Sequence, residues 1–434
     1  MQPPHTVSKR KFDVIIVGAG IVGLSCAYHI LSEEPSTNVL LIEKAPSAGQ
    51  GDTAKSGAAI RNMFTSEVNR LLAETSIDFY SHIQDGLGFP LRLEFVGYLW
   101  LLTSGMVEHF YPIIERMRRT GIALKVWDSQ ELSEMLPESK LHVNHDDKEA
   151  QIMRLSSIVK GVQGLRCGTI GPEKLVEFYE AETRKMGATI HYSEPVRSLT
   201  IGPKLDLPRE PLVWQRTNVT GVETFKGNYE AECTILATGA WTPSLLDPLG
   251  IDSHIRTKKR QVFSLKGPGV RSLLYAKGFN EQGVLPLTIV PPCSAYIKPN
   301  RVDASVWVGV SDYVGRSFAF EEEPIAEQEF YEYNIYPVIS HYFPHFLNVR
   351  PFNKWAGHYD MNTVDANPYI FEFPGLIVAV GTSGSGIIKA DAIGRIVAAA
   401  HMKKEIATLY GGKHFKVSRL GIETRDVEPE GFVI

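Results

Sequence analysis

The chain has 434 residues, 44% of them hydrophobic and 10% aromatic, which is enough for one large or two interleaved globular domains with a sizeable core. Lys and Arg (45) nearly balance Asp and Glu (49), and neither sign forms a block, so no nucleic-acid partner is expected. The four cysteines are far apart without a CxxC pair, which predicts no metal site or dithiol centre and favours a reducing cytoplasm.

The start of the chain has the pattern of a βαβ unit. A β-branched run over 11–17 predicts a strand, apolar residues at helical spacing over 21–30 predict a helix, and 38–42 predict a second strand. The apolar run at 12–17 is much shorter than the ~18 residues of a membrane span. We therefore expect a cytoplasmic protein without a transmembrane segment, while docking to the inner face of a membrane and homo- or hetero-oligomers stay open.

The rest of the chain alternates between helical and β-rich stretches. Helices are predicted over 67–83, 107–119, 173–186 and 321–343, a strand over 189–192, and a mainly antiparallel sheet over 206–310. Near the end, a strand over 376–380, a glycine turn and a helix to about residue 402 repeat the opening theme.

Nucleotide-type segments at both ends of the chain predict a discontinuous first domain with a second domain inserted into it. The first domain is expected to comprise 1–90, 160–255 and 350–434, and the second 91–159 and 256–349, with 411–434 as a C-terminal tail.

The opening turn, from Gly18 to Gly23, reads GxGxxG between the predicted strand and helix. Its glycines permit a tight turn and close approach to a pyrophosphate, and the helix N-terminus supplies free N–H groups. Glu43 closes the second strand 20 residues beyond Gly23, where an acidic side chain takes ribose hydroxyls and repels the extra phosphate of NADP. These features together predict an adenine dinucleotide site; a glycine turn without a ligand is the alternative.

Two further segments bear on whether that dinucleotide is NAD or FAD. The apolar run 234–236 ends in Ala-Thr-Gly, similar to the returning strand of FAD enzymes, although it can also be only a strand and a turn. The glycine motif 381–386 follows a buried strand and opens a helix, whose dipole can stabilise an anionic reduced flavin. Packing alone is the alternative for that motif.

Several longer segments resemble the D-amino-acid oxidase superfamily of FAD enzymes. They are FDVIIVGAGIVGLSCAYHI, TAKSGAAIR, ILATGAW and WAGHYDMNTVDANPYI with PGLIVAVGTSGSGIIKADAIGRIVA; in the middle of the chain only Ala295–Pro299 is recognisable. Within the superfamily they resemble the branch of sarcosine oxidase, dimethylglycine dehydrogenase and dye-linked L-proline dehydrogenase. The resemblance implies an α/β fold with a Rossmann-like, glutathione-reductase-type FAD-binding domain and an inserted substrate domain of antiparallel β-sheet plus helices.

The resemblance also implies site residues. FAD contacts are expected at Gly18, Gly20, Ile21, Val22, Gly23, Glu43, Lys44, Lys55, Ser56, Gly57, Ala237, Thr238, Gly239, Trp241, Gly381, Gly384, Ser385, Gly386, Ile387 and Lys389. In the sarcosine oxidase branch an arginine and a lysine hold the substrate carboxylate. Arg61 matches the arginine, with a structural salt bridge or flavin contact as alternatives. Lys389 lies one place after the family lysine, a shift of ~100° on a helix, so an exposed helix lysine is its alternative.

Two departures from the sarcosine oxidase pattern are informative. Trp307 stands where oxidases have a lysine over the flavin, which predicts poor use of oxygen if the strand 305–309 is correctly aligned. No cysteine lies near His358, where sarcosine oxidases link their flavin, so we expect non-covalent FAD. Tyr296, His358 and Tyr359 are candidates for the pocket wall, and each is also a plausible core residue; for His358, pairing with the flavin is a further alternative.

The predicted activity is a dehydrogenase that oxidises the C–N bond of a small amino or imino acid, with L-proline favoured and N-alkyl amino acids next. Electrons are expected to pass to a dye, a quinone or a redox protein. D-Amino-acid oxidase and glycine oxidase chemistry is disfavoured because no arginine lies within 355–360. The alternatives are an oxidase of sarcosine or N-methyl amino acids that uses oxygen, and a non-catalytic FAD scaffold or electron-transfer subunit.

Overall fold

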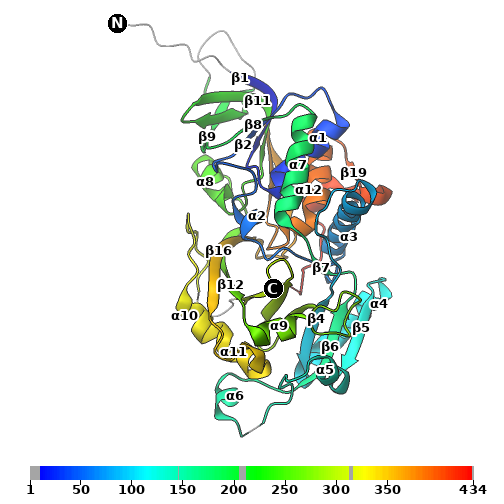
Figure 1. Cartoon of the computed structure of the whole chain (residues 1–434). Helices are drawn as coiled ribbons and strands as arrows, with labels where there is room; N and C mark the ends of the chain where they lie inside the picture. Colours follow the sequence, from blue (N-terminus) through cyan, green and yellow to red (C-terminus); the bar gives the residue numbers. More distant parts are fainter. Residues whose placement is uncertain (1–9, 145, 205–211, 312–315, 433–434) are drawn as a thin grey trace.

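The computed structural model describes residues 10–144, 146–204, 212–311 and 316–432. Two eight-stranded sheets dominate an elongated molecule, one in each half (Figure 1). Parts of the predicted ranges 1–90, 206–310 and 411–434 lie outside the described residues.

The first sheet has the parallel core that the glycine motifs predict. Its order is β17-β18-β11-β1-β2-β8, and β10 and β9 extend it from β11. The parallel strands are β18 (Leu376–Val380), β11 (Gly227–Leu236), β1 (Arg10–Val17), β2 (Val39–Ile42) and β8 (Thr189–His191). The antiparallel strands are β17 (Tyr369–Phe373), β10 (Thr217–Thr224) and β9 (Val196–Pro203). The strands β2 and β18 are buried along their whole length, as in sheets covered on both faces.

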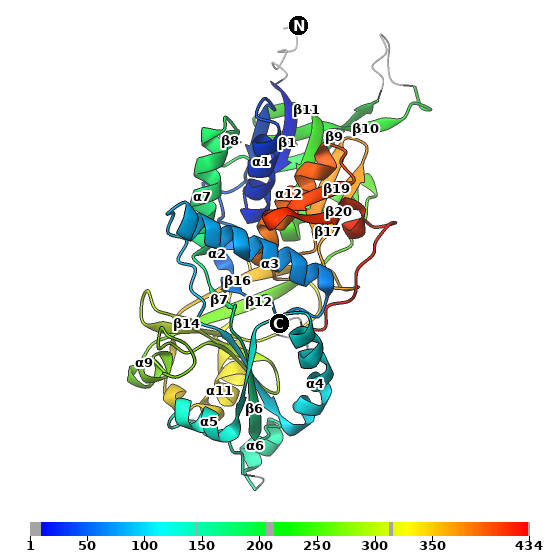
Figure 2. The ribbon, with the colours of Figure 1, turned by 90° about the vertical axis from the view of Figure 1, so that its right-hand side faces the viewer.

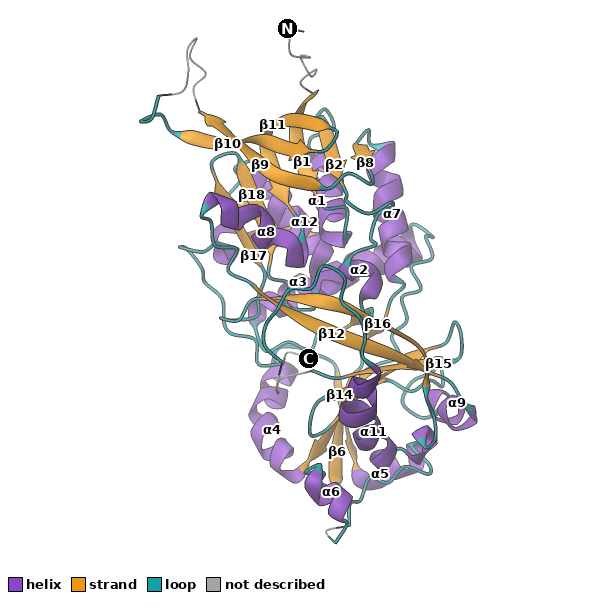
Figure 3. Ribbon diagram, turned by 90° about the vertical axis from the view of Figure 1, so that its left-hand side faces the viewer, coloured by secondary structure: helices purple, strands orange, loops and turns teal. Residues whose placement is uncertain are grey.

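Helices cover this sheet, and glycine permits their closest approach. The main ones are α1 (Ile21–Glu33), α3 (Glu67–Ser81), α7 (Pro172–Lys185) and α12 (Gly386–His401), with α8 (Thr242–Leu246) apart from them (Figure 3). A Cβ atom on Gly394 of α12 would lie 2.3 Å from the Ser25 hydroxyl of α1. A side chain at Gly394 would therefore force the two helices apart.

The second sheet is almost entirely antiparallel, with order β16-β12-β15-β14-β13-β4-β6-β5; only β13 and β4 pair in parallel. Its strands are β16 (Pro351–Met361), β12 (Arg256–Leu265), β15 (Ser305–Gly309), β14 (Ala295–Asn300), β13 (Leu287–Val290), β4 (Tyr98–Thr103), β6 (Ile158–Gly164) and β5 (Leu124–Asp128). The helices α5 (Ser129–Met135), α9 (Pro268–Leu274) and α11 (Tyr336–Tyr342) share a core with one face. The long strands β12 and β16 cross the middle of the molecule, between the two halves (Figure 3).

Several further elements lie outside the two large sheets. They are α2 (Asp52–Lys55), β3 (Ala59–Ile60), α4 (Ser104–Arg119), α6 (Lys148–Ile152), β7 (Gly168–Thr169), α10 (Gln328–Phe330), β19 (Ile406–Leu409) and β20 (Lys413–Lys416). After β20 the described chain descends along one side of the molecule toward α4 (Figure 2).

The predicted fold class is confirmed, and most predicted elements agree with the structure to within a few residues. The helix predicted over 321–343 is an exception, because 321–327 is not helical and helix begins only at Gln328. Lys259 pairs with Glu321 and Glu327, and these contacts hold the segment in an extended path. The domain boundaries stay a prediction; β6 and β16, which they assign to the first domain, pair within the second sheet.

Candidate functional site

The opening turn is tight enough to require glycine at two positions. Gly18 has φ +97°, and a Cβ there would lie 2.7 Å from the Ala237 carbonyl oxygen. A Cβ on Gly23 would lie 1.9 Å from the Gly18 carbonyl oxygen. The turn therefore brings α1 against the ends of β1 and β11, with its N-terminal N–H groups at the edge of the sheet.

Glu43 is held against this turn. Its carboxylate accepts hydrogen bonds of 2.8 Å from the Ala19 and Ala45 N–H groups, and the residue is 8% exposed. Each carboxylate oxygen can accept more than one hydrogen bond, so capacity remains for a ligand hydroxyl. Glu43 also lines a cavity that runs from the turn toward the second sheet.

This cavity has an empty volume of about 1670 Å³, its solvent-open part included. Three buried polar atoms belong to residues that line it: Arg260 Nε, Ser311 Oγ and His358 Nε2. None of the three has a hydrogen-bond partner within the described residues. Because buried polar groups are normally satisfied, these atoms indicate a polar ligand that spans the cavity. An FAD molecule, with its phosphates, hydroxyls and flavin carbonyls, fits this set.

His358 is fixed by Asp52, a residue that the sequence analysis missed. The Asp52 carboxylate accepts from the His358 backbone N–H at 2.8 Å and lies 3.2 Å from Nδ1. Phe320 stacks on the imidazole with a centroid distance of 5.5 Å. Nδ1 is therefore engaged, and Nε2 is the nitrogen left for a ligand.

A segment from the second half of the chain contacts residues that line the cavity. Glu322 accepts a hydrogen bond from the Trp241 indole at 2.9 Å and pairs with Lys44, whose ammonium lies 3.8 Å from the Trp241 ring centroid. Lys44 and Trp241 both line the cavity. Neither Phe320 nor Glu322 was predicted as a site residue, and Glu322 fell within the predicted helix 321–343, which would separate it from these partners.

The C-terminal glycine motif meets the cavity from the opposite side. Gly384 has φ +80°, and a Cβ there would lie 2.2 Å from the Tyr359 ring. The Asp360 carboxylate accepts from the N–H groups of Gly381 and Thr382, at 2.8 and 3.1 Å. Burial raises the pKa of Asp360 even though these hydrogen bonds favour its charged form. The motif thus directs the N-terminus of α12 toward the cavity.

Tyr296, Tyr359 and Arg260 line the end of the cavity formed by the second sheet. The Arg260 guanidinium carbon lies 4.8 Å from the Tyr359 ring centroid. Burial raises the pKa of Tyr296 well above its ordinary value, so this phenol stays protonated. Arg260 was missed because it lies in a basic run, RTKKR, that reads as an ordinary exposed strand edge.

Arg61 and Lys389 come together behind this end of the cavity. Both cations approach the Phe64 ring, with the guanidinium carbon at 4.2 Å and the ammonium nitrogen at 4.7 Å from its centroid. Arg61 donates to the Met63 carbonyl at 2.6 Å and to the Phe432 carbonyl. Lys389 donates to Ser385 Oγ at 2.6 Å and to Asn69 Oδ1. Lys389 is fully buried, so the alternative of an exposed helix lysine is wrong.

Trp307 lies in β15 directly opposite Lys298 of β14. The Lys298 ammonium is 4.0 Å from the Trp307 ring centroid, and Trp355 packs edge-on against that ring at 4.9 Å. The Trp355 indole donates to the Lys55 carbonyl at 2.9 Å, which joins this stack to a segment that lines the cavity. Burial lowers the pKa of Lys298 to about 7.

Most residues predicted from the sequence line one cavity. They are Gly18, Gly20, Ile21, Val22, Glu43, Lys44, Lys55, Ser56, Gly57, Ala237, Thr238, Gly239, Trp241, Tyr296, His358, Tyr359, Gly384, Gly386 and Ile387. Gly23, Gly381 and Ser385 lie next to lining residues in sequence but are not part of the lining, and neither are Arg61 and Lys389. The individual contacts with cofactor or substrate stay predictions.

This parallel sheet with its glycine turn and cavity defines a dinucleotide-binding protein. A family model described as FAD dependent oxidoreductase (DAO) matches residues 13–400. The chain belongs to this family, and FAD is its cofactor.

Relatives and solved structures agree with this assignment. FAD-dependent oxidoreductase domain-containing protein 1 of Xenopus laevis is 23% identical over 91% of this chain and 80% of its own length. Mitochondrial dimethylglycine dehydrogenase of Mus musculus is 27% identical over 61% of this chain and 27% of its own length. The structure of L-proline dehydrogenase from P. horikoshii has a TM-score of 0.72 at 22% identity and covers 91% of this chain and 94% of that chain.

Within the described residues, no helix is long and apolar enough to cross a membrane. The same part of the chain holds no group of three or more metal-ligating side chains.

Proposed function

We propose that the protein is an FAD-dependent dehydrogenase of a small amino or imino acid, with L-proline as the leading substrate. The observation that carries this proposal is the pair of buried cations at Phe64. Neither Arg61 nor Lys389 makes an ion pair with a carboxylate within the described residues. Buried charges are normally paired, so two unpaired cations form a site for an anion such as the substrate carboxylate.

The chain's own groups would bind and orient the substrate. Arg61 offers a planar fork of donors to the carboxylate, and Lys389 adds a second charge. The cations also lower the pKa of the substrate amine, which can then bind in its neutral form without a side-chain base. Tyr296 and Tyr359, which line the cavity, are the candidates for the wall of the substrate pocket.

FAD supplies the redox chemistry when bound: it accepts, at N5, the hydride that leaves the carbon beside nitrogen, and the product is an imine that water can hydrolyse. The electrons then pass to a dye, a quinone-like acceptor or a redox protein. The neutral Trp307 ring, in place of an oxidase lysine, supports a dehydrogenase over an oxidase.

Lys298 favours a second candidate, an oxidase of sarcosine or another N-methyl amino acid that uses oxygen. Its ammonium lies over Trp307, on the neighbouring strand. A cation at this place can stabilise superoxide as the flavin is reoxidised. With a pKa of about 7, however, Lys298 carries only part of its charge at neutral pH.

Anaerobic mixing of the holoprotein with a panel of amino acids tests the proposal. L-Proline should bleach the flavin absorbance, with sarcosine and dimethylglycine as the next candidates. Silence toward the whole panel would instead favour a scaffold in which FAD is structural, or a subunit of an electron-transfer complex.

A further inference from the structure

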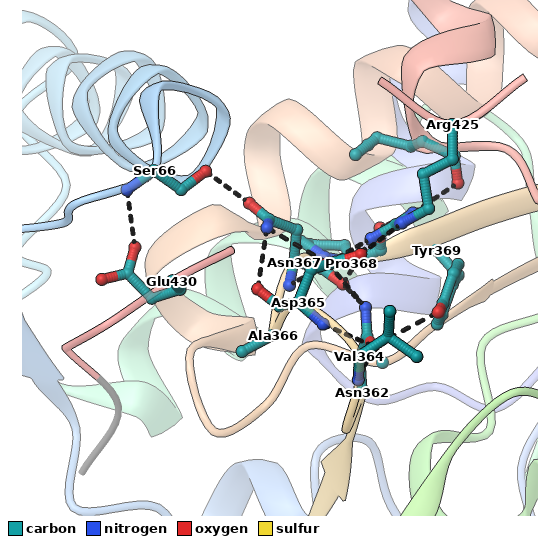
Figure 4. Close-up of polar contacts among 12 residues, drawn as sticks. Ser66, Asn362, Val364, Asp365, Ala366, Asn367, Pro368, Tyr369, Arg425 and Glu430 are labelled. Atoms are coloured by element: carbon teal, nitrogen blue, oxygen red, sulfur yellow. Dashed lines mark hydrogen bonds and ion pairs between the residues drawn. The ribbon is translucent and has the colours of Figure 1, made fainter. Parts of the chain in front are cut away.

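The C-terminal segment from Arg425 to Phe432 is fastened to the first half of the molecule. The Arg425 guanidinium makes a bidentate pair with Asp365, each N–O distance being 2.6 Å, and lies 4.0 Å from the Tyr369 ring centroid (Figure 4). Asn367 also donates to the Glu428 carbonyl at 2.9 Å. These contacts hold the segment against the loop that follows β16.

Glu430 is the second anchor of the segment. Its carboxylate accepts from the N–H groups of Thr65 and Ser66, at 2.9 and 3.1 Å, and caps the start of α3 (Figure 4). Asn69, the residue that also accepts from Lys389, donates to Glu430 at 3.3 Å. The chain is therefore positioned beside the Arg61–Lys389 pair just before its last described residues.

Phe432 fills the space next to that pair. Its ring is 4% exposed and packs against Trp100 and Phe110, with centroid distances of 4.6 and 4.9 Å. Its carbonyl oxygen accepts a hydrogen bond from Arg61. Between Glu430 and Phe432, the exposed Gly431 is the natural pivot for a local movement.

The groups around Phe432 are better suited to an anion than to a phenylalanine. Arg61 donates to a neutral carbonyl where it could bind a carboxylate with two hydrogen bonds. The buried Trp100 Nε1, in the same cluster as the Phe432 ring, has no hydrogen-bond partner within the described residues. Within the described residues, Arg61 and the Trp100 indole thus lie beside Phe432 without a carboxylate bound to either, and Lys389 approaches the same Phe64 ring as Arg61.

We infer that Phe432 determines the affinity of this site for carboxylates, because its carbonyl occupies Arg61 in the free protein until a substrate carboxylate displaces it. This inference rests on the proposed function of Arg61. Movement about Gly431 would release Arg61 and open the apolar cluster around Trp100, while the anchors at Arg425 and Glu430 stay in place. The apparent affinity for a carboxylate is then reduced by the fraction of molecules in which Phe432 is already displaced.

Substitution of Phe432 in the full-length holoprotein tests this inference without creating a new C-terminal carboxylate beside Arg61. The probe is cyclopentanecarboxylate, which resembles proline but has no nitrogen and cannot be oxidised at a C–N bond. Its binding is followed as a perturbation of the flavin absorbance. Phe432→Gly should lower its Kd on the order of tenfold, and Phe432→Ala and Phe432→Leu should give smaller decreases in that order.

Glu428→Gln is the matched control on the same segment, because among the described residues the Glu428 side chain pairs only with the exposed Arg116. It should leave the Kd unchanged. With an oxidisable substrate, Phe432→Gly should lower KM and leave kcat unchanged.

Three results would overturn the inference, and they differ in what they say of the proposed function. An unchanged Kd in Phe432→Gly means that the carbonyl does not compete, while the carboxylate site stands. A higher Kd means that Phe432 is part of the binding site and does not occlude it. Absence of probe binding in every variant, together with silence toward the amino acid panel, removes the carboxylate site itself and the inference with it.

Discussion

The FAD cavity and the Arg61–Lys389 pair lie close together but are built in different ways. Glycine turns and strand ends, each local in sequence, form most of the cavity, and three of its lining residues carry buried polar atoms without a partner within the described residues. The cation pair is assembled from the loop after β3, from α12 and from the C-terminal segment, and its donors are already engaged by neutral groups. A cofactor that stays bound can have a preformed site, whereas a site for a substrate that comes and goes can be occupied by the chain itself.

The largest effect is expected from Gly23→Val, a substitution in the opening glycine turn. Its Cβ would start 1.9 Å from the Gly18 carbonyl, so α1 cannot keep its place against the turn. We expect complete loss of FAD. Acid precipitation of the wild-type protein should leave yellow FAD in the supernatant, whereas the variant should release none.

Gly51→Ala is the control, because a Cβ at this lining residue meets no atom within 4 Å. It should retain FAD. Flavin that stays with the wild-type precipitate would contradict the non-covalent attachment, and a yellow Gly23→Val would show that the turn tolerates a side chain.

The ease of prediction also differs between the two regions. The motif from Gly18 to Gly23 can be recognised because a phosphate-binding turn needs its glycines at fixed spacing. Arg61 and Lys389 were found only through family resemblance. No sequence pattern indicates a role for Phe432, because a single phenylalanine has no distinctive chemistry. Its role depends on contacts with residues more than 300 positions away.

The failed helix prediction has a similar physical cause. The segment around Glu322 has polar and charged residues that are compatible with a helix, but its path is determined by Lys44, Trp241 and Lys259. These long-range ion pairs are not visible as a pattern, whereas Pro324, which disfavours a helical conformation at the preceding residue, is visible in the sequence. Features that depend on residues close together in the sequence can therefore be predicted, whereas features that depend on distant contacts cannot.

The second prediction concerns the cation pair. Arg61→Ala should lose about 2–5 kcal/mol of transition-state binding, or about 30- to 5,000-fold in kcat/KM, because a substrate carboxylate would lose its charged partner. FAD content should be unchanged, since Arg61 does not line the cavity.

Steady-state kinetics with flavin quantitation measure both effects. Arg92→Ala, which removes an exposed ion pair with Glu173, should have normal kinetics. Loss of flavin in Arg61→Ala, with normal kinetics in the remaining holoprotein, would make Arg61 a folding or cofactor residue.

The third prediction concerns the acceptor. After anaerobic reduction by substrate, the flavin should be reoxidised by an artificial dye on the order of 100-fold faster than by oxygen, because Trp307 provides no charge for superoxide. Stopped-flow absorbance follows both reactions. Any reaction with oxygen should increase as the pH falls below about 7, since Lys298 then becomes charged. Rapid reoxidation in air with stoichiometric hydrogen peroxide, at every pH, would identify an oxidase.

The fourth prediction concerns the pH dependence of carboxylate binding at the cation pair. Burial lowers the pKa of Lys389 to about 7, with Arg61 contributing to the decrease and Glu430 opposing it. Lys389 is therefore charged below this pH and neutral above it. The Kd of cyclopentanecarboxylate, whose own carboxyl group titrates far lower, should rise on the order of tenfold as the pH increases through about 7.

Flavin difference spectra across this pH range give the Kd values. Lys389→Met should bind weakly throughout and show no such dependence. If Lys389→Met keeps the wild-type pH profile, another group is responsible for it.

The smallest expected effect concerns the contribution of Glu322, from the second half of the chain, to the affinity for FAD. Burial acts to raise the pKa of Glu322, but hydrogen bonds from Lys44 and Trp241 outweigh it and keep the pKa below its ordinary value. The side chains of Glu322 and Lys44 are 62% and 40% exposed, so solvent screens the pair and its contribution is at most about 1 kcal/mol. Glu322→Gln should therefore raise the Kd of FAD by up to about fivefold, and the effect should diminish at high salt. Fluorescence of flavin released on dilution measures this Kd, with Glu323→Gln as the neighbouring control. Equal Kd values for the two variants would show that the Lys44–Trp241–Glu322 contact lies over the cavity without helping to retain the cofactor.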